Sequence, residues 1–199
     1  MDAGTFTRLL CCGKGMHHHC TKRKMSVAPK KAPKKKCPAC HQKFATSSEE
    51  RVKQVLIWVD KGKAWAQTFL ANKYQSGDGV PKSYQDAIRY LKMAIRQGDP
   101  SAMGGLADMY RIGQGVAKSF KKAAELYALA ANQGHAMAQH NLGVFYVNRM
   151  GVAQSNDKAR YWWLKAALQG NKQAINYLKK IDKQEGKATP TLPCCATCG

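Results

Sequence analysis

The middle of the sequence has no cysteine, because all eight lie near the ends, at 11, 12, 20, 37 and 40 and at 194, 195 and 198. A secreted domain held by disulfides would distribute its bridges through the body of the chain. Residues 1–15 also lack the apolar stretch of a signal peptide. We therefore expect a reduced protein of the cytoplasm or nucleus.

Long apolar runs and acidic residues are scarce as well. The longest apolar run is "VLIWV" at 55–59, far short of the ~20 residues that a membrane-spanning helix needs, so no membrane partner is expected. Asp and Glu total 12 against 33 Lys and Arg, which leaves a net charge of +21. No catalytic constellation stands out among so few acids, and the cysteine-free body offers no thiol nucleophile. An enzyme is therefore not the expectation.

The body of the chain has instead a period of 36 residues. Small and apolar residue types recur at this spacing over three or four copies, which is typical of a repeat protein. The recurring positions include Gly62, Gly98, Gly134 and Gly170; Ala66, Ala102, Ala138 and Ala174; Leu70, Leu106, Leu142 and Leu178; and Tyr74, Tyr110 and Tyr146. Later in the unit, Ala87, Ala123 and Ala159 and then Ala94, Ala130 and Ala166 recur.

Within each unit the spacing is helical. Ala66, Leu70 and Tyr74 fall on one helix face, the "SGDGV" stretch at 76–80 breaks that helix, and a second helix follows up to Gly98. The fold class predicted is therefore all-α: an α-solenoid of antiparallel helix pairs in which stacking buries each unit's apolar face. Arg149 stands where the first two units have glycine, and a left-handed Arg would cost about 1 kcal/mol. We thus expect the third turn to differ.

The unit "AWAQTFLANKYQSGDGVPKSYQDAIRYLKMAI" resembles a Sel-one-like repeat, a relative of the tetratricopeptide repeat. The resemblance covers residues 62–181, as units 62–97, 98–133 and 134–169 and a half unit 170–181. It implies a scaffold that binds a protein or peptide along its concave face. The variable first-helix residues that would line this face are Trp65, Asn72, Asp108, Arg111, Met137 and His140. As metal ligands, however, His135 and His140 are poorly spaced, and both are taken as surface residues.

Before the repeats, residues 1–46 form a candidate zinc-finger-like module. Cys37 and Cys40 have the Cys-x2-Cys spacing with which two thiolates bind one Zn²⁺. In a reduced compartment such cysteines indicate zinc rather than disulfides. Metal binding would also order a segment with almost no apolar core.

The pattern "CCGK", "HHHC" and "CPAC" resembles the second half of a RING-type finger. The resemblance implies zinc ligands Cys11, Cys12, His17, Cys20, Cys37 and Cys40, with Cys11 a bystander in one alternative. The family's first Cys pair is absent, so the finger is either truncated or degenerate. The cysteines of the tail 182–199, which is expected to be disordered, could complete it. RING fingers recruit ubiquitin-conjugating enzymes, so a ubiquitin ligase is implied as well.

Two features join these parts. The basic run at 22–36 has eight cations and no acid; it is interpreted as a solvated linker, a nuclear-import signal or a nucleic-acid contact. A connecting helix is predicted over 47–61, with Thr46 as its N-cap and Glu49 three residues later. The leading hypothesis is a protein-interaction adaptor. The alternatives are a ligase whose repeats select the substrate and a basic nuclear protein that contacts nucleic acid.

Overall fold

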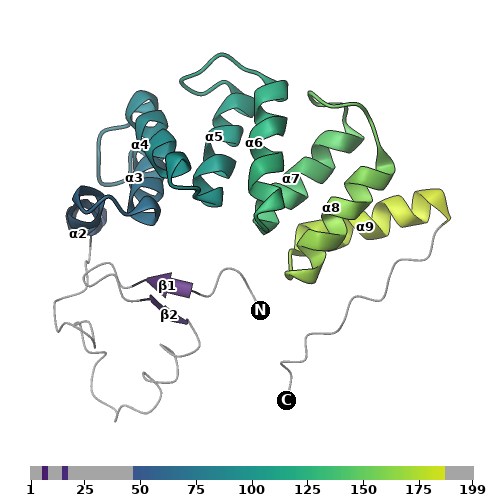
Figure 1. Cartoon of the computed structure of the whole chain (residues 1–199), viewed down its shortest axis with the longest axis horizontal. Helices are drawn as coiled ribbons and strands as arrows, with labels where there is room; N and C mark the ends of the chain where they lie inside the picture. The colour runs from purple at the N-terminus through teal and green to yellow at the C-terminus, as the bar shows by residue number, and fades with distance from the viewer. Residues whose placement is uncertain (1–5, 9–14, 18–46, 187–199) are drawn as a thin grey trace, which may run out of the picture. The chain divides into compact units, whose positions relative to one another are not determined.

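The computed structural model describes residues 6–8, 15–17 and 47–186, and it divides into two compact units between Tyr90 and Leu91. Figure 1 shows the chain with its helices labelled. The division falls inside helix α4 (Tyr84–Arg96), and each unit is described by itself. None of the helices in the described ranges is long and apolar enough to cross a membrane.

The N-terminal unit contains two short strands that the sequence did not predict. Strands β1 (Phe6–Arg8) and β2 (Gly15–His17) pair antiparallel, with Phe6 opposite His17 and Arg8 opposite Gly15. The same unit holds helices α2 (Ser48–Asp60) and α3 (Ala64–Ser76) and the first part of α4.

Helix α2 begins one residue later than the sequence predicted. Its N-cap is Ser47, whose Oγ accepts the backbone N–H of Glu50 at 3.2 Å. The prediction of Thr46 as N-cap was therefore wrong by one residue. Trp58, in the last turn of α2, contacts Trp65 of α3 with 6.2 Å between the ring centroids. Helices α2 and α3 therefore pack together at their junction.

The helix α2 also obeys the period of the repeats. Serine recurs every 36 residues directly before the helices α2, α4, α6 and α8, at Ser47, Ser83, Ser119 and Ser155. Each of these serines accepts a backbone N–H three residues on, as an N-cap side chain does. What the sequence presented as a connecting helix is thus the second helix of a repeat unit.

A glycine contact supports this assignment of α2. Gly79 has a φ of +81°, and a Cβ at this position would lie 2.6 Å from the backbone carbon of Ser48. The equivalent Gly151, with a φ of +69°, would place its Cβ 2.4 Å from the backbone carbon of Phe120, the first residue of α6. Helices α2 and α6 therefore each begin against the turn of a following unit in the same way.

The C-terminal unit continues from α4 with five further helices. They are α5 (Pro100–Ile112), α6 (Phe120–Asn132), α7 (Ala136–Val147), α8 (Asn156–Leu168) and α9 (Lys172–Glu185). Each helix packs on the next along the chain. The last helix runs four residues past the limit of 181 that the repeat pattern indicated.

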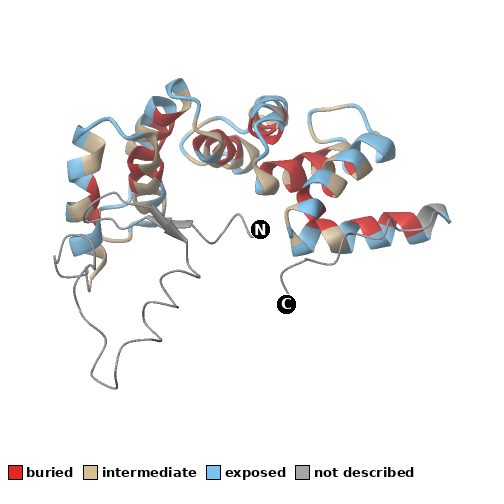
Figure 2. Cartoon of the chain, turned by 60° about the horizontal axis from the view of Figure 1, so that its bottom comes forward, coloured by how far each residue is buried: buried red, intermediate tan, exposed pale blue. Residues whose placement is uncertain are grey.

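The alanines and leucines that recur at 36 residues are buried, which confirms the solenoid of helix pairs. Figure 2 shows the buried residues along the facing sides of the helices. Alanine lets two backbones approach closely, while leucine fills the space between hairpins. At 5 % exposure or less lie Ala66, Ala102, Ala138, Ala174, Leu70, Leu106, Leu142, Leu178, Ala87, Ala123, Ala159, Ala94, Ala130 and Ala166.

The third turn does not differ from the first two as expected. Arg149 has a φ of 55° and stands in the left-handed region, as Gly77 and Gly113 do. The N–H of Met150 donates to the carbonyl of Phe145 at 3.0 Å, which is the bond that Gln114 makes one unit earlier and Asp78 two units earlier. The turn geometry is thus retained at a cost of about 1 kcal/mol for a non-glycine residue.

Candidate functional site

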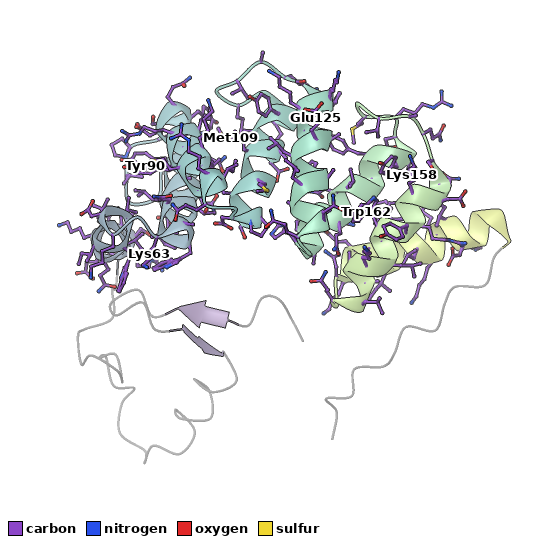
Figure 3. The ribbon with its side chains drawn as sticks, in the orientation of Figure 1. Lys63, Tyr90, Met109, Glu125, Lys158 and Trp162 are labelled. Atoms are coloured by element: carbon purple, nitrogen blue, oxygen red, sulfur yellow. The ribbon has the colours of Figure 1, made fainter. Side chains whose placement is uncertain are left out.

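A hollow opens between α7, α8 and α9 in the C-terminal unit. Its volume is about 350 Å³, at the lower end of the range of roughly 300–1,000 Å³ typical of ligand sites. The lining residues are Val144, Val147, Asn148, Asn156, Trp163, Tyr177, Lys180 and Ile181. Five of the lining residues are aliphatic or aromatic and the other three are two asparagines and a lysine, so the lining is mixed apolar and polar; Figure 3 draws the side chains of these helices. We call it the α7–α9 groove.

The indole of Trp163 forms the floor of this groove. The side chain is 2 % exposed, and its Nε1 donates to the backbone carbonyl of His140 at 3.0 Å. The close approach depends on Gly143, because a Cβ there would lie 2.4 Å from Trp163 Nε1. Earlier units have Ala71 and Ala107 in the place of Gly143. Removing one methyl group from α7 therefore makes room for a tryptophan on α8.

Tyr177 forms a wall of the groove. Its ring centroid lies 5.0 Å from that of Trp163 and 5.4 Å from that of His140. The residue is nevertheless 43 % exposed, so part of the ring faces the open side. An aromatic side chain that is fixed on one face and exposed on the other is well suited to hold a partner. The sequence pattern did not single out Trp163 or Tyr177. The available signal was Gly143, which replaces the alanine of earlier units and leaves room for a large neighbour.

His140 was predicted to lie on the surface and to line a binding face, but it is buried. Only 6 % of the residue is exposed, and burial lowers the pKa of its imidazole. The surface prediction failed because the aromatic ring of Tyr177 covers it, and that contact joins residues far apart in the sequence. His140 therefore supports the groove from below and cannot contact a partner directly in this arrangement.

His135 is also less exposed than predicted, since it caps α7. Its Nδ1 accepts the backbone N–H of Ala138 at 3.2 Å, and the side chain is half-buried. Burial lowers the pKa of this imidazole, and the carboxylates of Asp99 and Asp108 oppose that shift. The neutral form is required here, because Nδ1 can accept a hydrogen bond only when it carries no proton.

Asp108 and Arg111 lie together on α5. Arg111 donates to Asp108 Oδ1 from Nε at 3.1 Å and from Nη2 at 2.9 Å, and the hydroxyl of Tyr127 on α6 donates to the same oxygen at 2.6 Å. Burial of Tyr127, followed by the Asp108 carboxylate, raises the pKa of its hydroxyl. Both predicted residues are half-exposed and held in place by a buried side chain from the next helix.

The remaining predicted residues are dispersed. Met137 on α7 is 50 % exposed. Trp65 and Asn72 lie on α3 in the N-terminal unit; Asn72 is exposed and Trp65 is half-buried against Trp58. Met137, Trp65 and Asn72 are not among the residues that line the α7–α9 groove.

Five of the six predicted metal ligands, all cysteines, lie outside the described residues. These are Cys11, Cys12, Cys20, Cys37 and Cys40; the basic run 22–36 and the tail from 187 also lie outside the described residues. His17 is the last residue of β2. Within the described ranges, no three His, Cys, Asp or Glu side chains gather to hold a metal ion.

This arrangement of paired helices, with small residues at close approaches and left-handed turns, defines a helical-repeat protein of the α-solenoid class. The family model for the Sel1 repeat matches residues 66–99, 100–135 and 136–171, just over half of the chain. The chain therefore belongs to the Sel1 repeat family, whose members generally mediate protein–protein interactions.

Solved structures agree with this membership. A Sel1 repeat protein from Oxalobacter formigenes is 37 % identical, with a TM-score of 0.59, over 65 % of this chain and 97 % of that one. The protective antigen c5321 of uropathogenic Escherichia coli, which displays an SLR fold, is 28 % identical with a TM-score of 0.64. That match covers 72 % of this chain and 31 % of c5321.

A third structure shows the fold alone. The Helicobacter pylori cysteine rich protein B is 21 % identical with a TM-score of 0.56, over 68 % of this chain and all of that one. A search of curated proteins found no match to the chain.

Proposed function

We propose that this protein is an interaction adaptor that binds a segment of a partner protein in the α7–α9 groove. The observation that carries the proposal is the exposed ring of Tyr177 beside an open hollow whose floor is a buried tryptophan. A partner side chain placed there would contact apolar surface on three helices. Interfaces draw most of their binding free energy from a few such central contacts.

The rigidity of the groove supports the proposal. Trp163 is fixed by its hydrogen bond to His140 and by the packing that Gly143 allows. A site whose side chains are held before the partner arrives loses less conformational entropy on binding. The first helices α7 and α9 both line the groove, together with α8, and the first helices are where the sequence led us to expect a partner.

The test is selection of random peptides of about ten residues on the full-length chain, followed by affinity measurements with variants. Tyr177→Ala should weaken the selected peptides by about tenfold or more. The matched control is Tyr161→Ala, since Tyr161 is 51 % exposed and lies on α8 outside the groove lining. Asn148→Trp, an exposed residue of the lining, should also block binding by filling the hollow.

Thermal unfolding of each variant separates loss of the site from loss of the fold. If selected peptides bind the Tyr177→Ala and Asn148→Trp variants as well as the unchanged chain, the groove is not the site. If no peptide is selected at all, the adaptor function itself loses its support.

We also propose that the N-terminal cysteines bind zinc. The proposal rests on the Cys-x2-Cys spacing of Cys37 and Cys40 and on the adjacent pair Cys11 and Cys12 in the sequence. Thiolates at such spacing are the usual ligands of structural zinc. The ligase alternative depends on this zinc module, and the nucleic-acid alternative depends on residues 22–36; both stay predictions.

Zinc per chain, measured on the purified full-length protein, tests the second proposal. The expected result is bound zinc that Cys37→Ser/Cys40→Ser removes, and a chain ending at residue 190 should keep the same amount if the tail cysteines are not ligands. Absence of zinc from the reduced, unchanged chain would contradict the proposal.

A further inference from the structure

The first helices of the C-terminal unit differ in chemistry at equivalent positions. Two positions on α5, α7 and α9 follow one another at 36 residues and stay accessible. They hold Asp108 and Arg111 on α5, Val144 and Val147 on α7, and Lys180 and Lys183 on α9. The surface therefore changes from a mixed-charge pair to an apolar pair to a basic pair.

The pair on α5 contributes little net charge. Arg111 and Asp108 form an ion pair at 2.9 Å, and the hydroxyl of Tyr127 also binds the carboxylate. A carboxylate and a guanidinium this close largely cancel each other's field at a distance. This part of the surface thus has no strong preference for a charged partner.

Helix α7, at the centre, has no charged residue in its sequence "AMAQHNLGVFYV". Val144 and Val147 line the groove beside Trp163 and Tyr177. At the start of α8 the groove edge carries Asn156, followed by Asp157 and Lys158, which oppose each other in charge. The centre of the surface is therefore apolar and near neutral.

Helix α9, on the other side of the groove, is basic, with four lysines against two acidic residues, Asp182 and Glu185. Lys172, Lys179, Lys180 and Lys183 are all exposed. Asp182 is buried, and it forms an ion pair with Arg160 of α8, so it does not offset these lysines at the surface. An ammonium of this group, Lys180, lies in the groove lining itself.

We propose that the partner segment is acidic: one large apolar side chain enters the α7–α9 groove, and neighbouring carboxylates lie against Lys180 and Lys183. This inference rests on the proposed function and adds the chemistry of the partner. The charge complementarity sets which segments are accepted, because a lysine in the same place would meet like charge. The apolar contact supplies most of the affinity, since exposed ion pairs are worth little by themselves.

The experiment uses three synthetic peptides of about ten residues and the full-length chain. The first has one phenylalanine flanked by glutamates, the second replaces the glutamates with lysines, and the third replaces the phenylalanine of the first with alanine. The first should bind about tenfold more tightly than either of the others, and its affinity should fall as salt is added.

Charge reversal locates the effect. Lys180→Glu/Lys183→Glu should weaken the acidic peptide by about tenfold and improve the basic one. The matched control is Lys92→Glu/Lys121→Glu, which changes the net charge equally at two exposed lysines of α4 and α6. The control should change the affinity by less than about twofold.

The outcomes separate the inference from the function on which it rests. If peptides bind in a Tyr177-dependent way but the basic peptide binds as well as the acidic one, the groove is a binding site and the acidic preference is overturned. Equal effects of the α9 reversal and the control reversal would overturn it too, since net charge alone would explain the binding. If neither the defined peptides nor selected ones bind, both proposals fail.

Discussion

Helices α2 and α9, the first and last of the described helices, differ from the helices between them at equivalent positions of the 36-residue unit. The helices between them have small, buried residues where α2 and α9 have charged, exposed ones. On the second helices, the fully buried alanines 87, 123 and 159 correspond to Arg51 of α2, which is exposed. On the first helices, Ala71, Ala107 and Gly143 correspond to Lys179 of α9, also exposed. Small residues are needed where a partner helix packs closely, and a charged residue is tolerated only where water takes its place.

The comparison indicates that α2 and α9 act as capping helices. Terminal repeats need a polar outer face, because each repeat otherwise presents the apolar surface that its neighbour would bury. Arg51 donates to Ser48 Oγ at 2.9 Å, which fixes its guanidinium near the start of α2. Arg51 of α2 and Lys179 of α9 thus each put an exposed charge where the other units have a small, buried residue.

A second difference lies inside the last helix pair. In the preceding unit, Ala124 of α6 and Tyr146 of α7 belong to one apolar core cluster. At the equivalent positions of α8 and α9 stand Arg160 and Asp182, an ion pair whose carboxylate is buried. A buried ion pair stabilises little relative to apolar packing, but removing one partner is costly.

The largest expected effect follows from this pair. Asp182→Ala should destabilise α9 by about 3 kcal/mol, because it leaves the Arg160 guanidinium largely buried without its counter-charge. Hydrogen exchange of the α9 amides measures the local loss. The double variant Arg160→Ala/Asp182→Tyr restores the residue types of the preceding unit and should recover most of it. If the double variant is as unstable as the single one, the last pair does not pack like the pair of the preceding unit.

The next effect tests whether α2 is packed as a genuine repeat helix. Gly79→Ala should cost about 3 kcal/mol, since it adds a contact with the backbone of Ser48 to the strain of a left-handed residue. Gly62→Ala is the matched control: its φ is +68° and nothing lies within 4 Å of the added carbon. It should cost only about 1 kcal/mol. Equal costs, measured by urea unfolding, would mean that α2 does not rest on the turn.

The smallest effect depends on pH and concerns the caps of the first helices. Asp99, His135 and Asn171 occupy the same N-cap position. Folding lowers the pKa of His135, so the unfolded chain binds a proton more readily, and stability falls as the pH drops below about 6.5. Protonation removes the hydrogen bond from Ala138, which costs about 1 kcal/mol.

His135→Asn keeps the cap in a form that does not titrate. The variant should lose less stability between about pH 7 and pH 5 than the unchanged chain, as measured by urea unfolding at each pH. His140, whose pKa burial also lowers, keeps the remaining dependence in both proteins. The same pH dependence in both would show that the cap does not titrate in this range.

Much of the helical fold could be predicted because the residue types that recur every 36 residues each favour one kind of structural position. Alanine and leucine at 36-residue spacing mark buried contacts, and glycine marks turns with positive φ. The exception was Arg149, where the turn kept its geometry without a glycine. Neighbouring repeats impose the turn, and a cost of about 1 kcal/mol is too small to change it.

The site was harder to predict, because its parts come from different helices. Met137 was selected for its variable position and is exposed, but it lies outside the groove lining. His140 was selected for the same reason and lies beneath Tyr177. A helical period says which face of a helix is buried, but it does not say which neighbour's side chain covers it.

The sequence by itself determined the number of residues in a unit, the order of helices and the small residues at which they approach, because these follow from local spacing repeated along the chain. Only the tertiary structure decided that the start of α2 packs against the turn at Gly79, that Asp182 is buried against Arg160, and that Trp163 and Tyr177 frame a groove. Those facts depend on contacts between residues 14 to 31 positions apart, where packing decides among side chains that the periodic pattern treats alike.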